Sequence, residues 1–425
     1  MPSENTPSNP ASVLRVCIVA ENASFRFGGE ACLPLHYFSR LRRRSIDAWL
    51  VVHGRTRPEL EALFSKDQDR IRYIPDRWYH RLMWKLSRYL PRRVSEATFG
   101  TLTLLINQLI QRRLIKQLIR DHGCNLIHQP IPVSPKAPSF ISNLGVPVII
   151  GPMNGGMDFP AAFRGAESLF TRVAVALGRS SAHLVNSIVA GKKHATLLLV
   201  ANQRTRQALP SCVRGEVIEI PENGVDLNIW SPPHTAAPSS NPACFVFVGR
   251  LVDWKRLDFV LHALASLPDA QLKVIGDGPM RPPWSALAQQ LGIADRIHWL
   301  GWRPQPECAA ILQSATALVL PSIYECGGAV VLEAMACGIP AVATAWGGPA
   351  DYIDTTCGIL IPASNSKEIT QGFAEAMRSL IIDPEMRSRL GANGRRRVEE
   401  LFDWEQKIDR ILELYGKAIH DFQRN

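Results

Sequence analysis

The chain has 425 residues, of which 46% are apolar and 20% are charged, with a formal net charge of +10. This composition is that of a globular protein without long low-complexity tracts, and the length predicts two domains, each able to bury a core. No uncharged apolar run reaches about 18 residues, so we expect no segment to span a bilayer.

Nine cysteines are scattered along the chain, without a Cys-x-x-Cys pair or a histidine at metal-ligand spacing. Several lie in apolar runs, where reduced cysteine behaves as a small hydrophobic residue, which predicts a reducing compartment. Residues 1–12 are polar and rich in Pro, Ser and Asn, unlike a secretory signal. We therefore expect a cytoplasmic protein, either free or peripheral on the inner face of a membrane.

The charge is divided unevenly between the two halves of the chain. Residues 1–210 carry 29 Lys and Arg against 13 Asp and Glu, a net +16, whereas residues 211–425 carry 19 against 25, a net −6. The N-terminal half is therefore expected to face an acidic partner.

Short apolar runs alternate with helical stretches through the first 225 residues, which predicts a parallel sheet with helices on both faces. The predicted strands are residues 13–20, 48–52, 126–128, 147–150 and 196–200. Gly28-Gly29 follows the first strand, where it either lets a ligand approach the backbone or only begins a helix. His128 ends the strand 126–128, a place where histidine is more often structural. The glycine-rich turn 151–156 could line a site or be a tight turn.

A basic segment interleaved with aromatic residues follows at 77–93. It holds six Lys and Arg and no acidic residue, together with Trp78, Trp84 and Tyr89. Cations among aromatic side chains are typical of segments that lie on an anionic membrane. A plain helix with a solvated basic face is an equal alternative, and nucleic acid comes third because no recognition motif accompanies the charge.

Residues 231–242 are rich in Pro, Ser and Ala and predict a linker, after which a second series of strands and helices begins. Its predicted strands are 244–248, 271–275, 296–300, 315–320, 340–344 and 358–361. We predict an N-terminal domain at 1–225 and a C-terminal domain at 243–403. Two such domains are expected to hold a ligand between them, at the carboxyl ends of their strands.

Two cations flank the turn after the strand 244–248. In Gly249-Arg-Leu-Val-Asp-Trp-Lys255, Arg250 and Lys255 could clamp a diphosphate, because cations at a helix start otherwise oppose the helix dipole. Gly276-Asp-Gly278-Pro follows the next strand but lacks the third glycine of a dinucleotide fingerprint. Gly301-Trp302 ends the strand after that.

The most informative stretch is Pro321–Gly338, in which Glu325 and Glu333 lie eight positions apart. Glu325 is predicted in a strand-to-helix loop, and Glu333 about one and a half turns into the following helix. Gly327-Gly328 leaves backbone N–H groups at the helix start, which favours an anion. The two glutamates could take hydroxyl groups on either side of that anion, although a glutamate pair at this spacing, taken alone, is more often two ordinary exposed helix residues.

Pro-Ser-x-x-Glu, seven residues and then Glu-Ala-Met-Ala-Cys-Gly-x-Pro resembles the donor-site signature of glycosyltransferase family 4. The resemblance extends from about Gly28 to Gly358 and implies the GT-B fold, two Rossmann-like parallel-sheet domains facing a central cleft. It also implies that the last helix, 404–425, crosses back onto the N-terminal domain. The usual Gly-aromatic-Gly is replaced here by Cys326-Gly327-Gly328, which removes an aromatic wall.

The resemblance implies a role for each matching residue. Arg250 and Lys255 would stabilise the leaving diphosphate, Glu325 would hold hydroxyls of the donor sugar, and His128 would reach that sugar from the other domain. The implied donor-binding residues are Gly29, Gly249, Gly276, Gly278, Trp302, Gly327, Gly328, Ala329 and Glu333.

We therefore expect a metal-independent, retaining hexosyltransferase that uses a UDP- or GDP-linked sugar as co-substrate and needs no further cofactor. The expected acceptor is a saccharide, lipid-linked, in surface polysaccharide biosynthesis. Asp67-Gln-Asp69 spells a metal-binding Asp-x-Asp but lies in a charged stretch away from a strand end, so we interpret it as solvated surface. Two alternatives remain: a GT-B sugar-nucleotide epimerase or hydrolase, and a non-catalytic, membrane-attached partner that binds nucleotide sugars.

Overall fold

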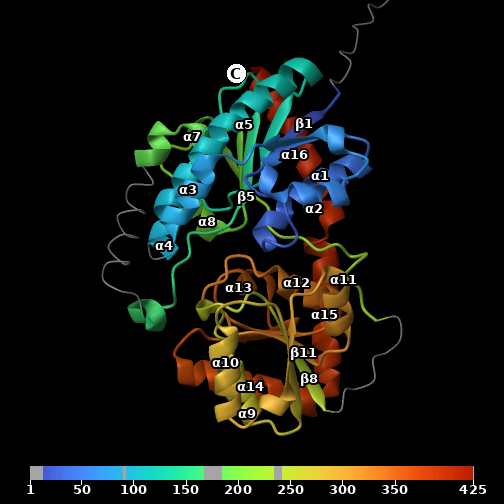
Figure 1. Ribbon diagram of the computed structural model, residues 1–425. Coiled ribbons are helices and arrows are strands. Elements are labelled where there is room, and N and C mark those ends of the chain that lie inside the picture. Colours follow the sequence, from blue (N-terminus) through green and yellow to red (C-terminus); the bar gives the residue numbers. More distant parts are fainter. Residues whose placement is uncertain (1–12, 90–91, 167–183, 234–241, 425) are drawn as a thin grey trace, which may run out of the picture.

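The computed structural model describes residues 13–89, 92–166, 184–233 and 242–424. Within these ranges the chain forms two domains, each built on one parallel sheet with helices on both faces (Figure 1). The predicted fold class, an α/β protein with two Rossmann-like parallel-sheet domains, is confirmed. The polar N-terminus 1–12 and most of the predicted linker, residues 234–241, lie outside the described residues.

The N-terminal domain has a seven-stranded sheet in the order β3-β2-β1-β4-β5-β6-β7. The strands are β1 (Arg15–Val19), β2 (Asp47–His53), β3 (Ile71–Ile74), β4 (Leu126–Gln129), β5 (Val148–Met153), β6 (Leu197–Val200) and β7 (Glu216–Glu219). The helices are α1 (Gly29–Arg43), α2 (Arg57–Leu63), α3 (Trp78–Ser87), α4 (Arg92–Ser95), α5 (Thr101–His122), α7 (Gly191–His194) and α8 (Gln203–Gln207).

Alternate residues of β1 enter separate cores on the two faces of this sheet. Val16 and Ile18 join the core that contains α1, whereas Cys17 and Val19 join the core that contains α5. Successive side chains of a strand point to opposite faces, so a central parallel strand covered on both faces is apolar throughout. This explains why β1 was recognisable as a continuous apolar run.

The C-terminal domain has a six-stranded sheet in the order β10-β9-β8-β11-β12-β13 and one continuous core. The strands are β8 (Ala243–Val248), β9 (Ala270–Ile275), β10 (Ile297–Gly301), β11 (Ala317–Leu320), β12 (Ala341–Thr344) and β13 (Gly358–Ile361). The helices are α9 (Leu257–Ala265), α10 (Arg281–Gln290), α11 (Gln305–Gln313), α12 (Ala329–Ala336), α13 (Gly348–Tyr352), α14 (Ser366–Ile382) and α15 (Pro384–Leu401).

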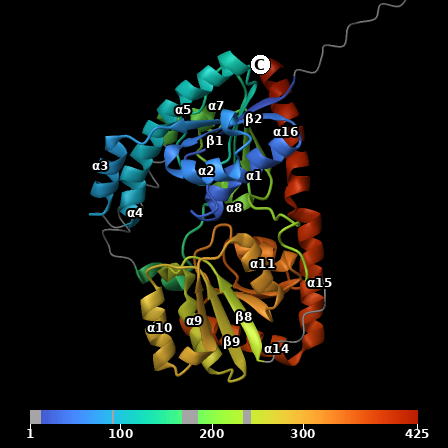
Figure 2. The same cartoon turned by 45° about the vertical axis from the view of Figure 1, so that its right-hand side comes forward.

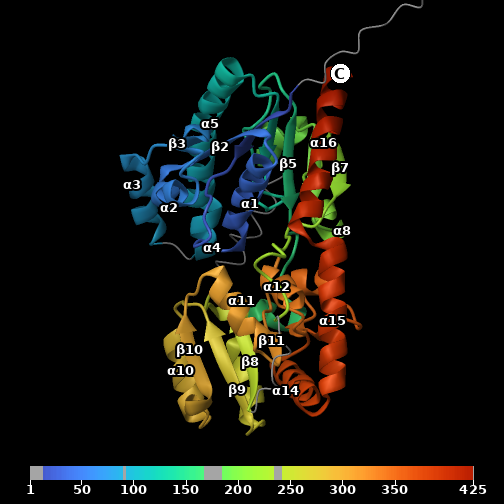
Figure 3. The same ribbon diagram turned by 90° about the vertical axis from the view of Figure 1, so that its right-hand side faces the viewer.

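The last helix, α16 (Trp404–Arg424), leaves the C-terminal domain and lies along the N-terminal one, continuing the direction of α15 (Figures 2 and 3). Its apolar face, which includes Trp404, Ile408, Ile411 and Tyr415, is buried in the same core as α1. An amphipathic helix of this kind is stable because its apolar face is covered. Here the N-terminal domain supplies that cover.

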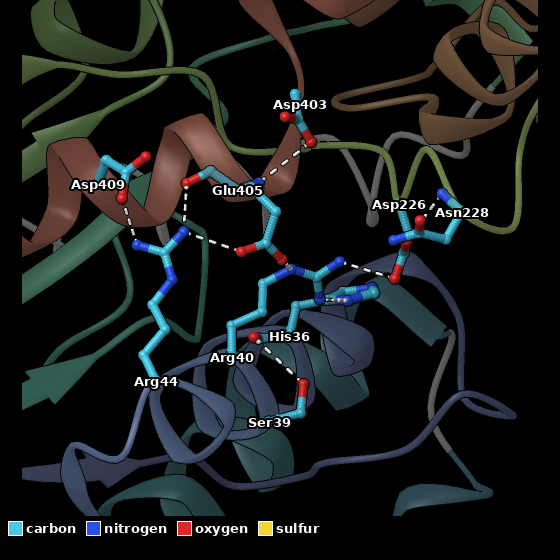
Figure 4. Close-up of polar contacts among 9 residues, drawn as sticks. All are labelled: His36, Ser39, Arg40, Arg44, Asp226, Asn228, Asp403, Glu405 and Asp409. Atoms are coloured by element: carbon cyan, nitrogen blue, oxygen red, sulfur yellow. Dashed lines mark hydrogen bonds and ion pairs between the residues drawn. The ribbon is translucent and has the colours of Figure 1, made fainter.

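Two chain segments cross between the domains side by side. The Val225 N–H donates to the Phe402 carbonyl at 2.8 Å, and the Trp404 N–H donates to the Val225 carbonyl at 3.1 Å. Beside this crossing, Arg40 of α1 forms ion pairs with Asp226 at 2.8 Å and with Glu405 at 3.0 Å (Figure 4). The crossing is therefore fixed to α1 as well as to α16.

The basic segment at 77–93 forms α3 and the residues after it, on the side of the N-terminal domain away from α16 (Figure 3). Trp78, Trp84 and Tyr89 are 72%, 62% and 86% exposed. Leu90 and Pro91 lie outside the described residues. No helix in the described ranges combines the length and the apolar character needed to span a bilayer.

Candidate active site

Three glycine turns fit together at the carboxyl ends of β8, β9 and β10. The Gly276 N–H donates to the Gly301 carbonyl at 2.8 Å. A Cβ at Gly276 would lie 2.0 Å from the Gly249 carbonyl oxygen, and one at Gly278 would lie 2.3 Å from the Leu251 oxygen. Any side chain at these two positions would force the turns apart. The predicted Gly249, Gly276 and Gly278 therefore lie together at one edge of the sheet.

Lys255 and Glu325 meet at the same edge, because β8 and β11 are neighbouring strands. The Lys255 ammonium contacts a Glu325 carboxylate oxygen, and each side chain is 14% exposed. A pair sheltered to this degree interacts more strongly than a fully solvated one. Arg250 is exposed at the end of β8. The cation and the carboxylate predicted to act on one ligand are thus placed side by side.

The loop that carries Glu325 is packed tightly on its inner side. The Gly348 N–H donates to the Glu325 carbonyl at 2.8 Å. A Cβ at Gly327 would lie 2.5 Å from Asn223 Nδ2, and Gly328 has a φ of +74°, which favours glycine. Ala329 then begins α12. The loop therefore presents its Gly327-Gly328 backbone at the start of a helix, the arrangement that binds anions.

Glu333 occupies the fifth position of α12 and is half-buried. Burial raises the pKa of its carboxyl to about 7. Burial, and secondarily the Glu333 charge, raises the pKa of the Cys32 thiol in α1 to about 12, so Glu333 lies near the N-terminal domain. Trp302, at the end of β10, is 52% exposed. Trp302 directly follows the glycine turn at Gly301, whereas Glu333 lies within α12.

His128, which was predicted to contact the transferred sugar, lies in the interior of the N-terminal domain. Its side chain is fully buried, with Nδ1 2.7 Å from the Tyr415 hydroxyl and Nε2 2.7 Å from the Gly151 carbonyl. Burial lowers the pKa of His128 to about 4, so the ring is neutral. With both ring nitrogens used, His128 joins α16 to the sheet. The motif was matched, but the tertiary contact with Tyr415 was not foreseeable.

The predicted loop at Gly28-Gly29 is open. A Cβ at either glycine would meet no atom within 4 Å, and Gly28 has a φ of +105°. Glu30 follows, and its carboxylate accepts the Val133 N–H at 3.0 Å, joining this loop to the one after β4. Packing therefore does not require Gly29 to be glycine, which leaves room for a ligand beside it.

Three polar residues that sequence reasoning did not assign to the site lie between the domains. Asn154, from the turn after β5, donates to Glu222 Oε2 at 2.7 Å and to the Cys326 carbonyl at 2.8 Å. Asn223 donates to the Tyr352 hydroxyl at 2.9 Å. Burial raises the pKa of Glu222 to about 7, and the charges of Glu30 and Glu325 add to that rise. No local pattern marks Glu222, because its burial depends on both domains.

One group of described residues, His53, Asp76 and His80, is close enough together to hold a metal ion. His53 Nδ1 faces the Arg55 N–H at 3.2 Å, and His80 Nδ1 faces the Arg77 N–H at 3.0 Å. Each ring thus already uses its acceptor nitrogen, so the group is better described as a hydrogen-bonded cluster.

Asp67, the first residue of the Asp-x-Asp sequence, pairs with Arg42 at 2.8 Å, away from the edge that carries Lys255.

Residues 234–397 match the family model of glycosyl transferases group 1. The chain is 33% identical over 222 residues to D-inositol 3-phosphate glycosyltransferase of Mycobacteroides abscessus, covering 48% of each chain. It is 32% identical over 220 residues to alpha-maltose-1-phosphate synthase of Mycolicibacterium smegmatis, covering 47% of this chain and 57% of the relative. The chain thus spans about half the length of the curated relatives it matches.

Solved structures resemble the whole fold. Sucrose-phosphate synthase from Thermosynechococcus elongatus aligns over 95% of this chain and 98% of its own, with a TM-score of 0.66 at 20% identity. Anabaena HepE in complex with UDP aligns over 95% and 100%, with a TM-score of 0.67 at 17% identity. The predicted GT-B fold is confirmed, and residues 234–397 resemble glycosyl transferases group 1.

Proposed function

We propose that this GT-B chain, with its glycosyl transferases group 1 match at residues 234–397, moves a hexosyl group from a nucleoside-diphosphate sugar to a saccharide acceptor with retention. The observation that carries the proposal is the sheltered Lys255–Glu325 pair beside the interlocked turns at Gly249 and Gly276. A solved neighbour of the same fold, Anabaena HepE, has been determined with UDP-glucose, which supports a nucleotide sugar as donor.

The reaction needs stabilisation of charge on the departing diphosphate more than it needs a protein nucleophile. Arg250 and Lys255 supply two cations, and the Gly327-Gly328 backbone supplies N–H donors at a helix start. The acceptor hydroxyl oxygen bonds to the anomeric carbon on the face that the diphosphate leaves, and its proton passes to a departing phosphate oxygen. Glu325 holds sugar hydroxyls and Glu333 holds the ribose.

No divalent metal is required in this scheme, because side-chain cations neutralise the leaving group. We expect turnover to be unchanged in EDTA. Loss of turnover in EDTA that manganese or magnesium restores would contradict this part of the proposal.

We further propose that the acceptor is lipid-linked, in surface polysaccharide synthesis, and that α3 brings the enzyme to an anionic bilayer as a peripheral protein. Trp78, Trp84 and Tyr89 are exposed among cations on the side away from α16. Each basic residue near an anionic surface contributes about 1 kcal/mol of binding free energy, so several such residues together are enough for reversible attachment.

The test is to incubate the purified chain with UDP- and GDP-sugars, with and without a lipid-linked saccharide in anionic vesicles. Transfer to the saccharide supports the proposal. Release of free sugar or formation of an epimer would favour the alternative hydrolase or epimerase, and binding without turnover would favour a non-catalytic partner.

The membrane part has a matched pair of variants. Replacing Arg81 and Lys85 of α3, together with Arg88 directly after it, by Gln should abolish binding to anionic vesicles at low salt. Replacing the exposed Arg378, Arg389 and Arg396 of the C-terminal domain removes the same charge and should leave binding intact. Equal losses in the two variants, or no vesicle binding by the wild type, would indicate that α3 is a solvated helix and that the acceptor is a soluble sugar.

A further inference from the structure

A segment of the N-terminal domain, residues 154–164 after β5, makes contacts with the C-terminal domain. The Trp346 indole N–H donates to the Asp158 carbonyl at 2.8 Å. The Phe159 ring lies against that of Tyr324, with centroids 4.9 Å apart and the planes tilted by 37°, and Phe163 packs against the C-terminal core. This crossing segment, part of the green chain beside the C-terminal domain in Figure 1, therefore runs next to the loop that carries Glu325.

Asn154 begins the crossing segment (residues 154–164) and is 2% exposed, and its side-chain NH2 group donates to two acceptors. Its Nδ2 donates to Glu222 Oε2 at 2.7 Å and to the carbonyl of Cys326 at 2.8 Å. Its Oδ1 lies 3.4 Å from Asn202 Nδ2, a donor. An amide offers two N–H donors and one oxygen acceptor, so in this orientation the Asn154 side chain matches the two acceptors and the one donor around it.

The Cys326 carbonyl and the Gly327 N–H belong to the same planar peptide group. The hydrogen bond from Asn154 to this carbonyl therefore also sets the direction of the Gly327 N–H. The remaining sides of the loop are fixed by close packing. A Cβ at Gly348 would lie 1.9 Å from the Gly327 oxygen, and one at Gly327 would lie 2.5 Å from Asn223 Nδ2. Asn154 is a side-chain donor of the N-terminal domain that holds this loop.

We propose that Asn154 is a positioning residue that holds the Cys326–Gly327 peptide, and through it the diphosphate-binding N–H groups, in the orientation that leaving-group stabilisation requires. The expected effect of Asn154 on turnover rests on the proposed function. Its expected effect on the affinity for a nucleoside diphosphate can be measured without any turnover. The crossing segment thereby makes the donor site of the C-terminal domain depend on a residue of the N-terminal domain.

The test uses Asn154→Ala and Asn154→Asp, with Arg204→Ala as the matched control. Arg204 pairs with Asp351 across the same interface at 3.0 Å, and its Nε lies 3.4 Å from the Gly155 carbonyl. Calorimetry should show that Asn154→Ala loses about tenfold in affinity for a nucleoside diphosphate while its affinity for the nucleoside monophosphate stays within threefold. Turnover should fall by roughly 10- to 100-fold, as for a misplaced donor. Arg204→Ala should match the wild type in each measurement.

The aspartate variant adds a second measurement, the pH dependence of turnover, which a purely structural role of Asn154 would not change. A carboxylate at 154 would face the Glu222 carboxylate and the Cys326 carbonyl, both acceptors, whereas a protonated carboxyl can donate one hydrogen bond. Glu30, Glu325 and Lys407 are the other charged groups facing Glu222, and they are common to all variants. Turnover of Asn154→Asp relative to Asn154→Ala should therefore rise as the pH falls from about 8 to 5.

The outcomes separate the two proposals. If the wild type turns over no sugar nucleotide but Asn154→Ala still loses its preference for the diphosphate, the proposed function fails and the positioning role stands. If the wild type is active and Asn154→Ala behaves as Arg204→Ala does, the positioning role is overturned. A wild type that binds neither UDP nor GDP overturns both.

Discussion

The two domains use the carboxyl edges of their sheets differently. In the C-terminal domain the polar side chains at this edge, Lys255 and Glu325, remain partly exposed and face the glycine turns. In the N-terminal domain His128, in β4, is hydrogen-bonded to Tyr415 and Gly151. Lys192 of α7, which precedes β6, donates to the carbonyls of Ser134 and Pro135 at 3.1 and 2.5 Å. Lys255 and Glu325 thus remain accessible, whereas the polar atoms of His128 and Lys192 are bonded within the N-terminal domain.

The comparison teaches that a polar residue at a strand end is not by itself a sign of function. Burial lowers the pKa of Lys192 to about 7, as expected for a cation enclosed by the protein and served only by carbonyls. The distinguishing observation is whether the polar atoms are satisfied within the domain. The following predictions test that distinction.

The largest effect is expected where buried charge joins the domains. Arg40 is 2% exposed and pairs with Asp226 and Glu405, so Arg40→Ala should lower the free energy of unfolding by about 3–5 kcal/mol. Arg44 pairs with Glu405 and Asp409, which are 46% and 66% exposed. Arg44→Ala should therefore cost about 1 kcal/mol or less. Urea unfolding measures both, and equal losses would mean that Arg40 is not a buried junction.

On the donor edge, Lys255→Ala should reduce turnover by roughly 10²-fold, because a cation that stabilises the leaving diphosphate is lost. The fold should survive, since Lys255 belongs to a turn. Lys367→Ala, which removes an exposed lysine from α14, is the control and should be silent. Sugar-nucleotide turnover at saturating donor measures the effect, and a rate near that of wild type would remove Lys255 from the site.

His128→Phe should affect stability rather than turnover. It leaves the Tyr415 hydroxyl and the Gly151 carbonyl without a partner, at a cost of about 1–3 kcal/mol. The folded pKa of His128, about 4, lies below the usual value of 6.5, so the unfolded chain binds the extra proton. Wild-type stability should therefore fall as the pH drops from about 6.5 to 4, and the variant should lack this component.

Unfolding at several pH values measures the His128 component, with turnover of the folded variant as the second readout. Stability close to wild type combined with a large loss of turnover would return His128 to the catalytic residues.

The smallest effect concerns Glu333. Its carboxyl has a pKa raised to about 7, and only the ionised form is a full acceptor for ribose hydroxyls. The ratio of wild-type to Glu333→Gln affinity for a nucleoside diphosphate should therefore rise between pH 6 and 8, by up to about tenfold. Titration of the phosphates affects both proteins and cancels in the ratio, so a ratio independent of pH would contradict ribose binding by the carboxylate.

The sequence placed Gly249, Lys255 and Glu325 at one edge of the C-terminal sheet, because they lie in short motifs that directly follow apolar strands. It did not predict β3 and β7, the two edge strands of the N-terminal sheet, because an edge strand needs only a few apolar residues. Nor could it predict Asn154 and Glu222, which lie 68 residues apart and acquire their role only when both domains are in place. The hydrogen bond of His128 to Tyr415 could not be predicted for the same reason, because the two residues are 287 positions apart.

The packing of α16 on α1 also constrains the order in which the chain can fold during synthesis. Arg44 and Asp409 are 365 positions apart, and Trp404, Ile408 and Tyr415 complete the core around α1. As the ribosome adds residues, the N-terminal sheet emerges first, yet the whole C-terminal domain must be made before α16 can cover it. The first domain to be synthesised is therefore the last to finish its core, and its apolar face must be kept from aggregation in the meantime.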